Sequence, residues 1–113
     1  MSASITKHTP TFSTAPQIGL EDLAEIAALG YKTIICNRPD GEGGPDQPSS
    51  ASIKAEAEKL GLAFHSIPFT SGQLTEDLVK EFAKTIDNAN TPVLAYCRSG
   101  ARSTQIWSLG QAT

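Results

Sequence analysis

The sequence predicts an α/β fold, in which helices flank a small parallel sheet, and two observations carry this prediction. Short apolar runs rich in β-branched residues alternate along the chain with stretches whose apolar residues follow the period of an α-helix. Strands that are joined by crossover helices pair in parallel, with right-handed connections. The 113 residues suit one compact domain, so we expect residues 1–113 to form a single domain with one core and one site.

The first half of the chain is expected to contain two strands, a helix and a long loop. Residues 12–18 can form a strand, which Pro16 assigns to the edge of the sheet because proline cannot donate a ladder hydrogen bond. Residues 20–30 have the apolar spacing of an amphipathic helix, with acids in the first turn and glycine at the end. A β-branched strand over 31–36 follows, and the Pro- and Gly-rich segment 37–50 then forms a turn-rich loop.

The second half is expected to alternate between helices and strands. A serine at 50 or 52 can cap a helix that Gly61 ends, and Thr75 can cap another because acidic residues follow it. The remaining apolar runs have the length and composition of strands. In order, the predicted elements are a helix up to residue 60, a strand over 62–69, a helix from 75 to 88–90, a strand over 92–96 and a helix from 103 onward.

The candidate active site is Cys97, which follows the strand at 92–96 and precedes the last helix. The loop after it is short enough for its amides to curl around one point, and Gly100 can adopt the positive φ that such a turn needs. These amides, the helix N-terminus and the nearby arginines favour a negative charge, so we expect a thiolate beside an oxyanion site. The predicted binding residues of this loop are Arg98, Ser99, Gly100 and Ala101.

A structural role for Cys97 is the alternative, since free cysteine is among the most buried residue types. The glycine, two serines and two arginines within six positions of it favour the reactive role instead. Ligands of parallel α/β sheets bind at the carboxyl ends of the strands. Because Asn37 and Thr70 also lie at such ends, we expect their loops to converge with the Cys97 loop on one cleft.

Composition excludes several classes of function. Of the residues, 39% are hydrophobic and 19% are charged, which suits a globular core rather than a disordered chain. A net charge of −3 argues against nucleic-acid binding, and apolar runs far shorter than the ~20 residues of a transmembrane helix predict no membrane span. Residues 1–15 contain no cationic segment followed by an apolar stretch, so neither a secretory signal in this sequence nor a location outside the cytoplasm is expected. The lone His8 and His65 and the two separated cysteines predict neither a metal site nor a disulfide framework, and no cofactor is expected.

The segment CRSGARS at 97–103 resembles the loop of two families of cysteine enzymes, the tyrosine and dual-specificity phosphatases and the rhodanese sulfurtransferases. Over residues 12–110 the chain is most similar to the phosphatase-like domain of the bacterial β-lactamase-hydrolase-like proteins. The similarity lies in four segments, FSTAPQI, ICNRPDGE, FHSIPFTSG and PVLAYCRSGARSTQIW. It implies a fold like that of the dual-specificity phosphatases.

The resemblance also implies a role for three residues in the loop before the last helix and at the start of that helix. Cys97 is implied to be the nucleophile. Arg102 is implied to grip an oxyanion through its planar, two-pronged guanidinium group, which a lysine lacks. Ser103 is implied to donate a hydrogen bond to the sulfur as it leaves a covalent thiophosphate.

Three features depart from the phosphatase pattern. Four residues separate Cys97 from Arg102, as in rhodaneses, whereas the phosphatases have five. Tyr96 replaces the histidine that is usual before the cysteine. The segment FTSG at 69–72 carries no carboxylate where these phosphatases keep an aspartate general acid.

The loop after residue 36 offers a substitute acid. Asp40 or Glu42 could protonate the leaving group, while Arg38 adds positive charge to the site and binds substrate. In the alternative interpretation, the segment 39–41 is only a turn whose aspartate bonds local amides. Cys36 offers a similar choice, between a core residue and a thiol that resolves an oxidised or persulfidated active-site cysteine.

These residues predict a cysteine-dependent, phosphatase-like hydrolase that acts on a phosphoester through a thiophosphate at Cys97. Two alternatives stay open, a sulfurtransferase that carries a persulfide on Cys97 and a non-catalytic anion-binding domain. In all three cases the expected partner is a molecule that bears phosphate, sulfate or sulfane sulfur. Neither nucleic acid nor a membrane is expected as a partner.

Overall fold

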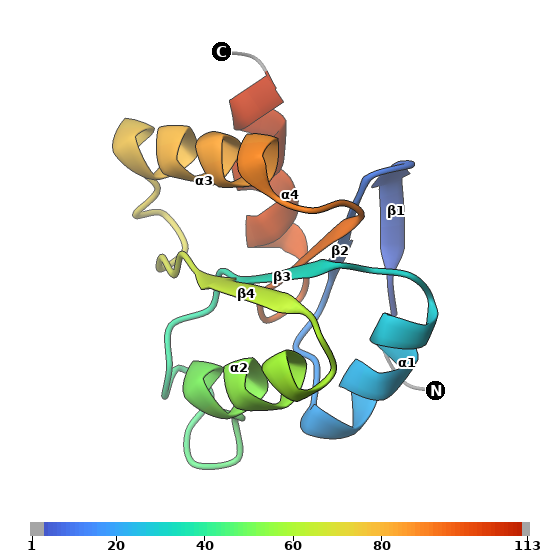
Figure 1. Cartoon of the computed structure of the whole chain (residues 1–113). Coiled ribbons are helices and arrows are strands. Elements are labelled where there is room, and N and C mark those ends of the chain that lie inside the picture. The colour runs from blue at the N-terminus through green and yellow to red at the C-terminus, as the bar shows by residue number, and fades with distance from the viewer. Residues whose placement is uncertain (1–3, 112–113) are drawn as a thin grey trace.

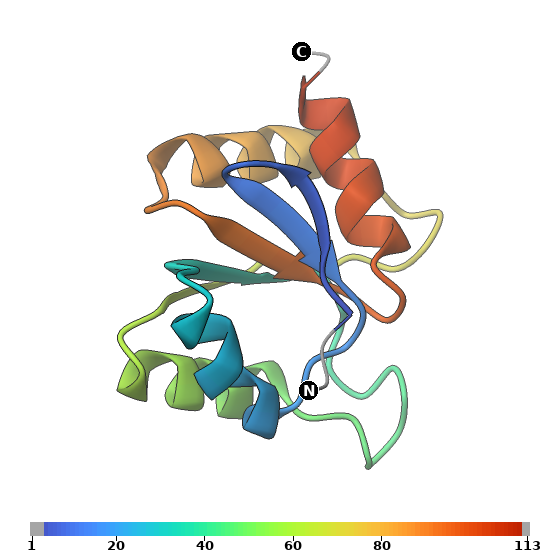
Figure 2. The same cartoon turned by 90° about the vertical axis from the view of Figure 1, so that its right-hand side faces the viewer.

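The computed structural model describes residues 4–111 and shows a sheet between two layers of helices (Figure 1). The five strands are β1 (Thr6–Thr9), β2 (Phe12–Ala15), β3 (Thr33–Cys36), β4 (Ala63–Ser66) and β5 (Val93–Tyr96). The helices are the 3₁₀ turn η1 (Leu20–Asp22), α1 (Leu23–Ala28), α2 (Ser50–Lys59), α3 (Glu76–Asn88) and α4 (Ala101–Gln111). Helices α1 and α2 cover one face of the sheet and α3 and α4 the other (Figure 2), which confirms the predicted fold class.

The sheet has the strand order β1-β2-β5-β3-β4 and is parallel except at one edge. The strands β2, β5, β3 and β4 pair in parallel, whereas β1 pairs antiparallel with β2. In register, Tyr96 of β5 lies opposite Ala15 on one side and Cys36 on the other, and Cys36 lies opposite Ser66. Four strands therefore end at the same level, and the loops that follow them leave from one edge of the sheet.

The prediction that residues 12–18 form an edge strand is wrong. Strand β2 covers only Phe12–Ala15 and lies buried between β1 and β5. Pro16 lies just beyond the strand, where its missing N–H removes no hydrogen bond from the ladder. The edge belongs instead to β1, whose sequence TKHT has too few apolar residues to predict a strand.

The helices begin and end close to the predicted residues. Thr75 caps α3, because its side chain accepts a hydrogen bond from the Leu78 amide. Gly30, with a φ of 101°, follows α1 as the predicted stop. The cap of α2 is Ser49, one residue before the first predicted candidate and three before the second. Helix α4 begins at Ala101, two residues earlier than expected.

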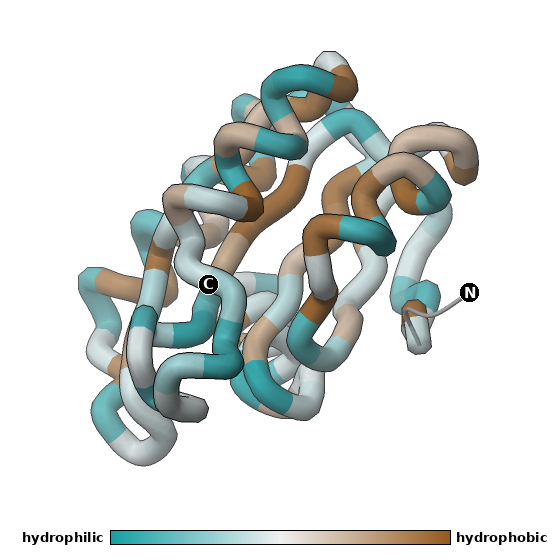
Figure 3. Tube along the Cα trace, turned by 90° about the horizontal axis from the view of Figure 1, so that it is seen from below, coloured by the Kyte–Doolittle hydropathy of each residue, from teal (hydrophilic) through white to brown (hydrophobic). Residues whose placement is uncertain are grey.

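Two apolar clusters, one on each face of the sheet, form the core. Neighbouring residues in a strand point to opposite faces, so Ile34 and Leu94 pack toward α1 and α2, whereas Ile35 and Val93 pack toward α3 and α4. Figure 3 shows strongly hydrophobic stretches of the trace between the layers. Among residues 4–111, no helix has the length and hydrophobicity to cross a membrane.

Replacement of Phe82 by alanine tests this core. The ring is fully buried on α3 and packs edge-on against Phe12 of β2, with 6.1 Å between the ring centroids. Loss of a buried phenylalanine leaves a cavity, so we expect the free energy of unfolding to fall by about 3–5 kcal/mol. Urea denaturation measures this change.

The matched control for that measurement is Leu29→Ala. The Leu29 side chain is 59% exposed, so its truncation should change the free energy of unfolding by only about 0.5 kcal/mol. Equal losses in the two variants would contradict the assigned core.

Candidate active site

Cys97 directly follows β5, at the level where β2, β3 and β5 end. Its amide donates to the Ala15 carbonyl at 3.3 Å, which continues the pairing with β2 by one residue. On the other side, the Asn37 amide donates to the Tyr96 carbonyl at 2.8 Å. Both Cys97 and Asn37 are fully buried. The predicted convergence of their two loops at the carboxyl edge of the sheet is therefore present in the structure.

The loop after Cys97 folds back on the sulfur. Gly100 has a φ of 93°, as predicted, and its amide donates to Cys97 Sγ at 3.1 Å. The next residue, Ala101, begins α4, and the Thr104 amide then donates to the Gly100 carbonyl at 3.0 Å. The sulfur therefore lies at the N-terminus of an 11-residue helix, where amides and the helix dipole favour an anion.

These surroundings favour the thiolate of Cys97. Burial raises the pKa of the thiol, but hydrogen bonds from the amides of Ser103, Gly100 and Arg102, together with the adjacent Ser103 side chain, outweigh it. The net result is a pKa below the ordinary value of a cysteine. Burial has the dominant effect on the other thiol and raises the pKa of Cys36. The pKa values of the two buried cysteines are thus shifted in opposite directions.

A buried hydrogen-bond chain connects Ser103 through Asn37 to Ile67, the residue that follows β4. The Ser103 hydroxyl donates to Asn37 Oδ1 at 2.8 Å, and Asn37 Nδ2 donates to the Ile67 carbonyl at 2.9 Å. Ser103 and Asn37 both have no exposed surface. The sequence placed Asn37 at this edge of the sheet but assigned it no role, because its partner lies 66 positions away.

Arg102 and Arg38 share the carboxylate of Glu42. Arg102 grips it with both terminal nitrogens, Nη1 to Oε2 at 2.8 Å and Nη2 to Oε1 at 2.5 Å. Arg38 Nε donates to the same Oε1 at 2.9 Å. Arg102 Nη1 also donates to the Phe69 carbonyl at 3.0 Å, so the predicted loop at 69–72 reaches the site as well. The arginine side chains are each 9% exposed and Glu42 is 27% exposed.

This arrangement keeps Glu42 ionised. Its hydrogen bonds with Arg102, opposed by partial burial and assisted by Arg38, lower the pKa of Glu42 to about 2. The same hydrogen bonds raise the pKa of Arg102. At neutral pH Glu42 is therefore a carboxylate, and it occupies on Arg102 the two-pronged position that an oxyanion ligand would take.

Asp40 lies in the same loop, but its carboxylate bonds to the start of α2. Oδ1 accepts a hydrogen bond from the Ser50 amide at 2.8 Å and Oδ2 accepts one from the Ser50 hydroxyl at 3.0 Å. This geometry favours the alternative interpretation, in which the aspartate bonds local groups in a turn. A catalytic role for Asp40 stays a prediction.

The remaining loop residues predicted to bind substrate lie on the surface. Arg98, Ser99 and Ala101 are exposed, whereas Gly100 is buried. The Arg98 carbonyl accepts a hydrogen bond from the Gln17 amide at 3.2 Å, and the Ser99 hydroxyl accepts one from the Ala101 amide at 3.3 Å. These bonds define the path of the loop, and the binding roles of its residues stay predictions.

Tyr96 occupies the position where related phosphatases have histidine. It is buried with Cys36 in the cluster beneath α1 and α2, and burial raises the pKa of its hydroxyl. Cys36 donates its thiol hydrogen to the Arg38 carbonyl at 3.3 Å. In this arrangement Cys36 packs as a core residue, and its proposed role as a resolving thiol stays untested.

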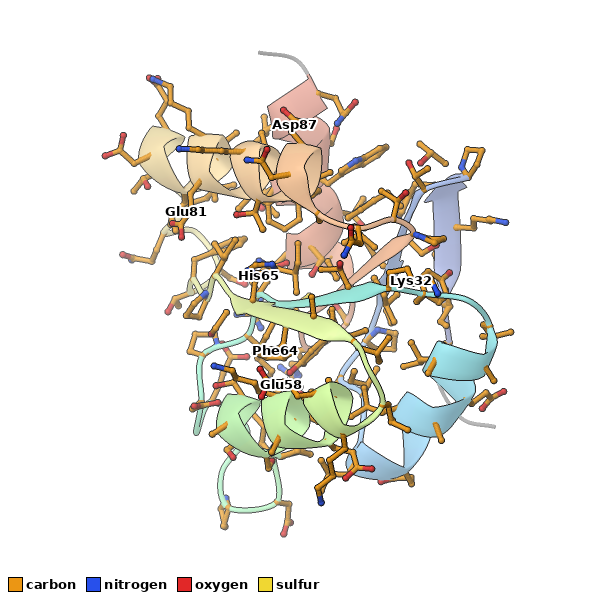
Figure 4. The ribbon with its side chains drawn as sticks, viewed as in Figure 1. Lys32, Glu58, Phe64, His65, Glu81 and Asp87 are labelled. Carbon is orange, nitrogen blue, oxygen red and sulfur yellow. The ribbon has the colours of Figure 1, made fainter. Side chains whose placement is uncertain are left out.

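The two histidines lie apart from Cys97 in the sheet. His65 is exposed on β4, where Figure 4 shows it on the opposite face of the strand from Phe64. His8 is partly buried on β1 and packs on Trp107, with 5.1 Å between the ring centroids. Within the described range 4–111, no three His, Cys, Asp or Glu side chains form a group that could hold a metal ion.

Known proteins share this fold and parts of this sequence. The β-lactamase hydrolase-like protein of Agrobacterium fabrum is 35% identical over 98 residues, which cover 87% of this chain and 22% of that protein. A candidate phosphatase from Neisseria meningitidis Z2491 has a crystal structure that superposes with a TM-score of 0.87 at 41% identity, over 94% of this chain and 75% of that one. Pseudomonas aeruginosa TpbA, solved with phosphotyrosine, superposes with a TM-score of 0.69 at 16% identity, over 93% of this chain and 64% of that one.

These likenesses agree with the resemblance in the sequence. The neighbours are phosphatases with the fold of the dual-specificity enzymes, which confirms the implied fold. The chain spans about a fifth of the length of the curated relatives it matches. Residues 4–113 match the family described as the beta-lactamase hydrolase-like protein, phosphatase-like domain, and the chain belongs to this family.

Proposed function

We propose that the protein is a cysteine-dependent, phosphatase-like hydrolase whose nucleophile is Cys97. The observation that carries the proposal is the contact between the Gly100 amide and Cys97 Sγ, 3.1 Å long, at the start of α4. It stabilises a thiolate at the point where a helix N-terminus and Arg102 favour an oxyanion. Membership of a phosphatase-like family supports the same chemistry.

In the proposed reaction, the Cys97 thiolate attacks the phosphorus of a phosphoester. A sulfur–phosphorus bond forms, the bond from phosphorus to the leaving oxygen breaks, and the leaving group departs with that electron pair. Water then attacks the phosphorus, which releases phosphate and returns the electron pair to sulfur. Arg102 binds the phosphoryl oxygens through both steps, after they displace the Glu42 carboxylate from its guanidinium group.

The charge of Glu42 and the hydrogen bonds of Asp40 limit which phosphoesters can react. Glu42 has a pKa of about 2 and holds no proton to donate at neutral pH. Asp40 is hydrogen-bonded to Ser50 at the start of α2. Without a general acid the leaving oxygen must depart as an anion, so we propose that activated esters such as aryl phosphates are the competent substrates.

Sulfur transfer is the second candidate function, and the four residues between Cys97 and Arg102 favour it. In this reaction the thiolate attacks the outer sulfur of thiosulfate, a sulfur–sulfur bond forms and sulfite departs, which leaves a persulfide on Cys97. A thiophilic acceptor such as cyanide then takes the sulfane sulfur as thiocyanate. Sulfite is stable as an anion at neutral pH, so this route needs no general acid.

The first prediction concerns the reactivity of the two thiols. Because the pKa of Cys97 is lowered and that of Cys36 is raised, only Cys97 gains thiolate below the ordinary cysteine pKa of about 8.5. We expect iodoacetamide to label Cys97 faster than Cys36 at pH 6. Peptide mass mapping of the native protein measures both rates, and faster labelling of Cys36 would overturn the choice of nucleophile.

The second prediction separates the candidate functions. Purified protein should hydrolyse an activated aryl phosphate, and it should turn over alkyl phosphates about 10²–10⁴-fold more slowly because general acid catalysis is missing. A parallel assay with thiosulfate and cyanide measures sulfur transfer, and Cys97→Ser is the control in both assays. Turnover of thiosulfate without turnover of the aryl phosphate indicates a sulfurtransferase. Phosphate binding without turnover of either substrate indicates a non-catalytic domain.

The third prediction concerns Glu42 as a competitor for Arg102. Glu42→Gln removes the negative charge from the guanidinium fork, so we expect inorganic phosphate to bind about tenfold more tightly, measured by calorimetric titration at low salt. Arg102→Lys should weaken binding, since a point charge replaces a fork. The matched control is Glu76→Gln, because Glu76 pairs with Lys80 on the exposed surface of α3. Unchanged affinity in Glu42→Gln would show that phosphate binds elsewhere.

A further inference from the structure

Arg38 and Arg102 lie side by side because they bond to the same oxygen atom. Glu42 Oε1 accepts a hydrogen bond from Arg38 Nε at 2.9 Å and another from Arg102 Nη2 at 2.5 Å. Each arginine side chain is only 9% exposed, and within residues 4–111 no other carboxylate forms an ion pair with either of them. Two nearly buried positive charges therefore share one negative charge, and the cluster keeps an excess of positive charge.

Arg38 is held in place by contacts that do not neutralise its charge. Its Nη1 donates to the side-chain oxygen of Gln17 at 3.1 Å. That oxygen faces Arg38 because the Gln17 nitrogen donates to the Ile18 carbonyl at 2.8 Å. The guanidinium group also lies against Gly43, where an added Cβ would be 2.6 Å from Arg38 Nη2. The position of Arg38 is therefore fixed by neutral groups as well as by Glu42.

A ligand that displaces Glu42 from Arg102 also changes the surroundings of Arg38. A single phosphoryl group in the two-pronged position on Arg102 removes the carboxylate that both arginines share. Arg38 then keeps a nearly buried positive charge without an anionic partner, which is costly in free energy. A ligand with a second anionic group next to the first supplies that partner. The paired arginines thus favour a substrate with two adjacent anionic groups.

The missing general acid favours a particular kind of second group. A departing alcohol holds its proton about as tightly as water, whose pKa is about 15.7, so it leaves poorly when no acid assists it. Glu42, with a pKa of about 2, has no proton to give at neutral pH. A departing phosphate is already stable as an anion there, because the second pKa of a phosphate monoester is about 6. A phosphoryl group that is joined to a second phosphate therefore has a leaving group that needs no proton.

We propose that the substrate is a phosphoanhydride, in which Arg102 binds the phosphoryl group that is transferred and Arg38 binds the second phosphate. This inference rests on the proposed function. The Cys97 thiolate attacks the phosphorus bound at Arg102, a sulfur–phosphorus bond forms, and the bond from that phosphorus to the bridging oxygen breaks. The electron pair stays on the bridging oxygen, which departs with the second phosphate. Water then attacks the phosphorus, the electron pair of the sulfur–phosphorus bond returns to sulfur, and the protons of the water go to the released phosphate and to solvent.

Calorimetric titration with two unreactive probes tests the binding of the second phosphate. Methylenediphosphonate carries two phosphonate groups on one carbon, and methylphosphonate carries one. The readout is the ratio of their affinities, because the release of Glu42 from Arg102 is common to both probes. We expect the ratio to favour the diphosphonate in the wild type and to fall about tenfold in Arg38→Gln, which loses a charge-assisted pair.

Two further variants separate the position of Arg38 from the charge of the protein. Gly43→Ala keeps every charge, but its methyl group displaces the guanidinium group of Arg38, so the ratio should fall here as well. Lys32→Gln is the matched control, because Lys32 is exposed just before β3, at the opposite edge of the sheet from Cys97 (Figure 4). It removes the same charge as Arg38→Gln and should leave the ratio unchanged. A ratio that stays at the wild-type value in Arg38→Gln or in Gly43→Ala overturns the proposal.

Hydrolysis assays test the substrate class, with EDTA present to suppress contaminating metal-dependent pyrophosphatases. Inorganic pyrophosphate and acetyl phosphate both have leaving groups that are anions at neutral pH, but only pyrophosphate carries a second phosphate. We expect kcat/KM for pyrophosphate to fall about tenfold in Arg38→Gln, and the value for acetyl phosphate to change much less. Equal losses on the two substrates overturn the proposal.

The titration and the hydrolysis assays together distinguish a failure of this inference from a failure of the proposed function. If Cys97-dependent hydrolysis of acetyl phosphate and aryl phosphate occurs but the probe ratio does not depend on Arg38, the proposed function stands and this inference is overturned. If the probe ratio falls in Arg38→Gln as expected but no substrate is hydrolysed, the second phosphate does bind at Arg38 and the hydrolase function fails.

Discussion

The pairing of β5 with a parallel neighbour on each side is the constraint on which the site depends. Because Tyr96 lies opposite both Ala15 and Cys36, the three strands end together and their next residues meet at one level. The Cys97 amide bonds to the Ala15 carbonyl and the Asn37 amide bonds to the Tyr96 carbonyl, so both residues are held by main-chain bonds. The apolar clusters on the two faces of the sheet fix the strands that carry these bonds. The position of the thiol is thus a property of the sheet, and α4 adds the anion-stabilising amides.

The electrostatics of the site follow from how its few charges are shared. Two nearly buried arginines share one carboxylate, Glu42, which lowers the cost of holding guanidinium groups away from water. The same carboxylate occupies the fork of Arg102 that an oxyanion would bind. In the proposed function, the resting site is therefore closed by a charge of the ligand's own sign, and an anion has to replace Glu42 on Arg102 before it reaches the thiolate. The binding free energy that a ligand gains at Arg102 is only the difference between the energy of its own hydrogen bonds and that of the Glu42 hydrogen bonds that it replaces.

The sequence predicted those features of the fold and of the site that depend on residues close together in the chain. The alternation of strands and helices, the cap at Thr75 and the positive φ of Gly100 all depend on residues close together in the chain, and each was predictable. Strand β1 was missed because TKHT lacks an apolar pattern, and the edge position of β2 was wrong because strand order depends on tertiary packing. The partners Arg102 and Glu42 are 60 positions apart. A contact of that separation has no local signal, so the sequence named both residues without pairing them.

The proposed function requires that Cys97 forms the covalent bond to the transferred group. The most direct measurement is the mass of the peptide that carries Cys97 after the protein is mixed with an activated aryl phosphate and quenched in acid within the first turnover. We expect the added mass of one phosphoryl group on that peptide, absent from Cys97→Ser and absent from the peptide that carries Cys36. An aryl phosphate that is hydrolysed while Cys97 stays unmodified throughout the first turnover, or a phosphoryl group found on another side chain, would contradict it.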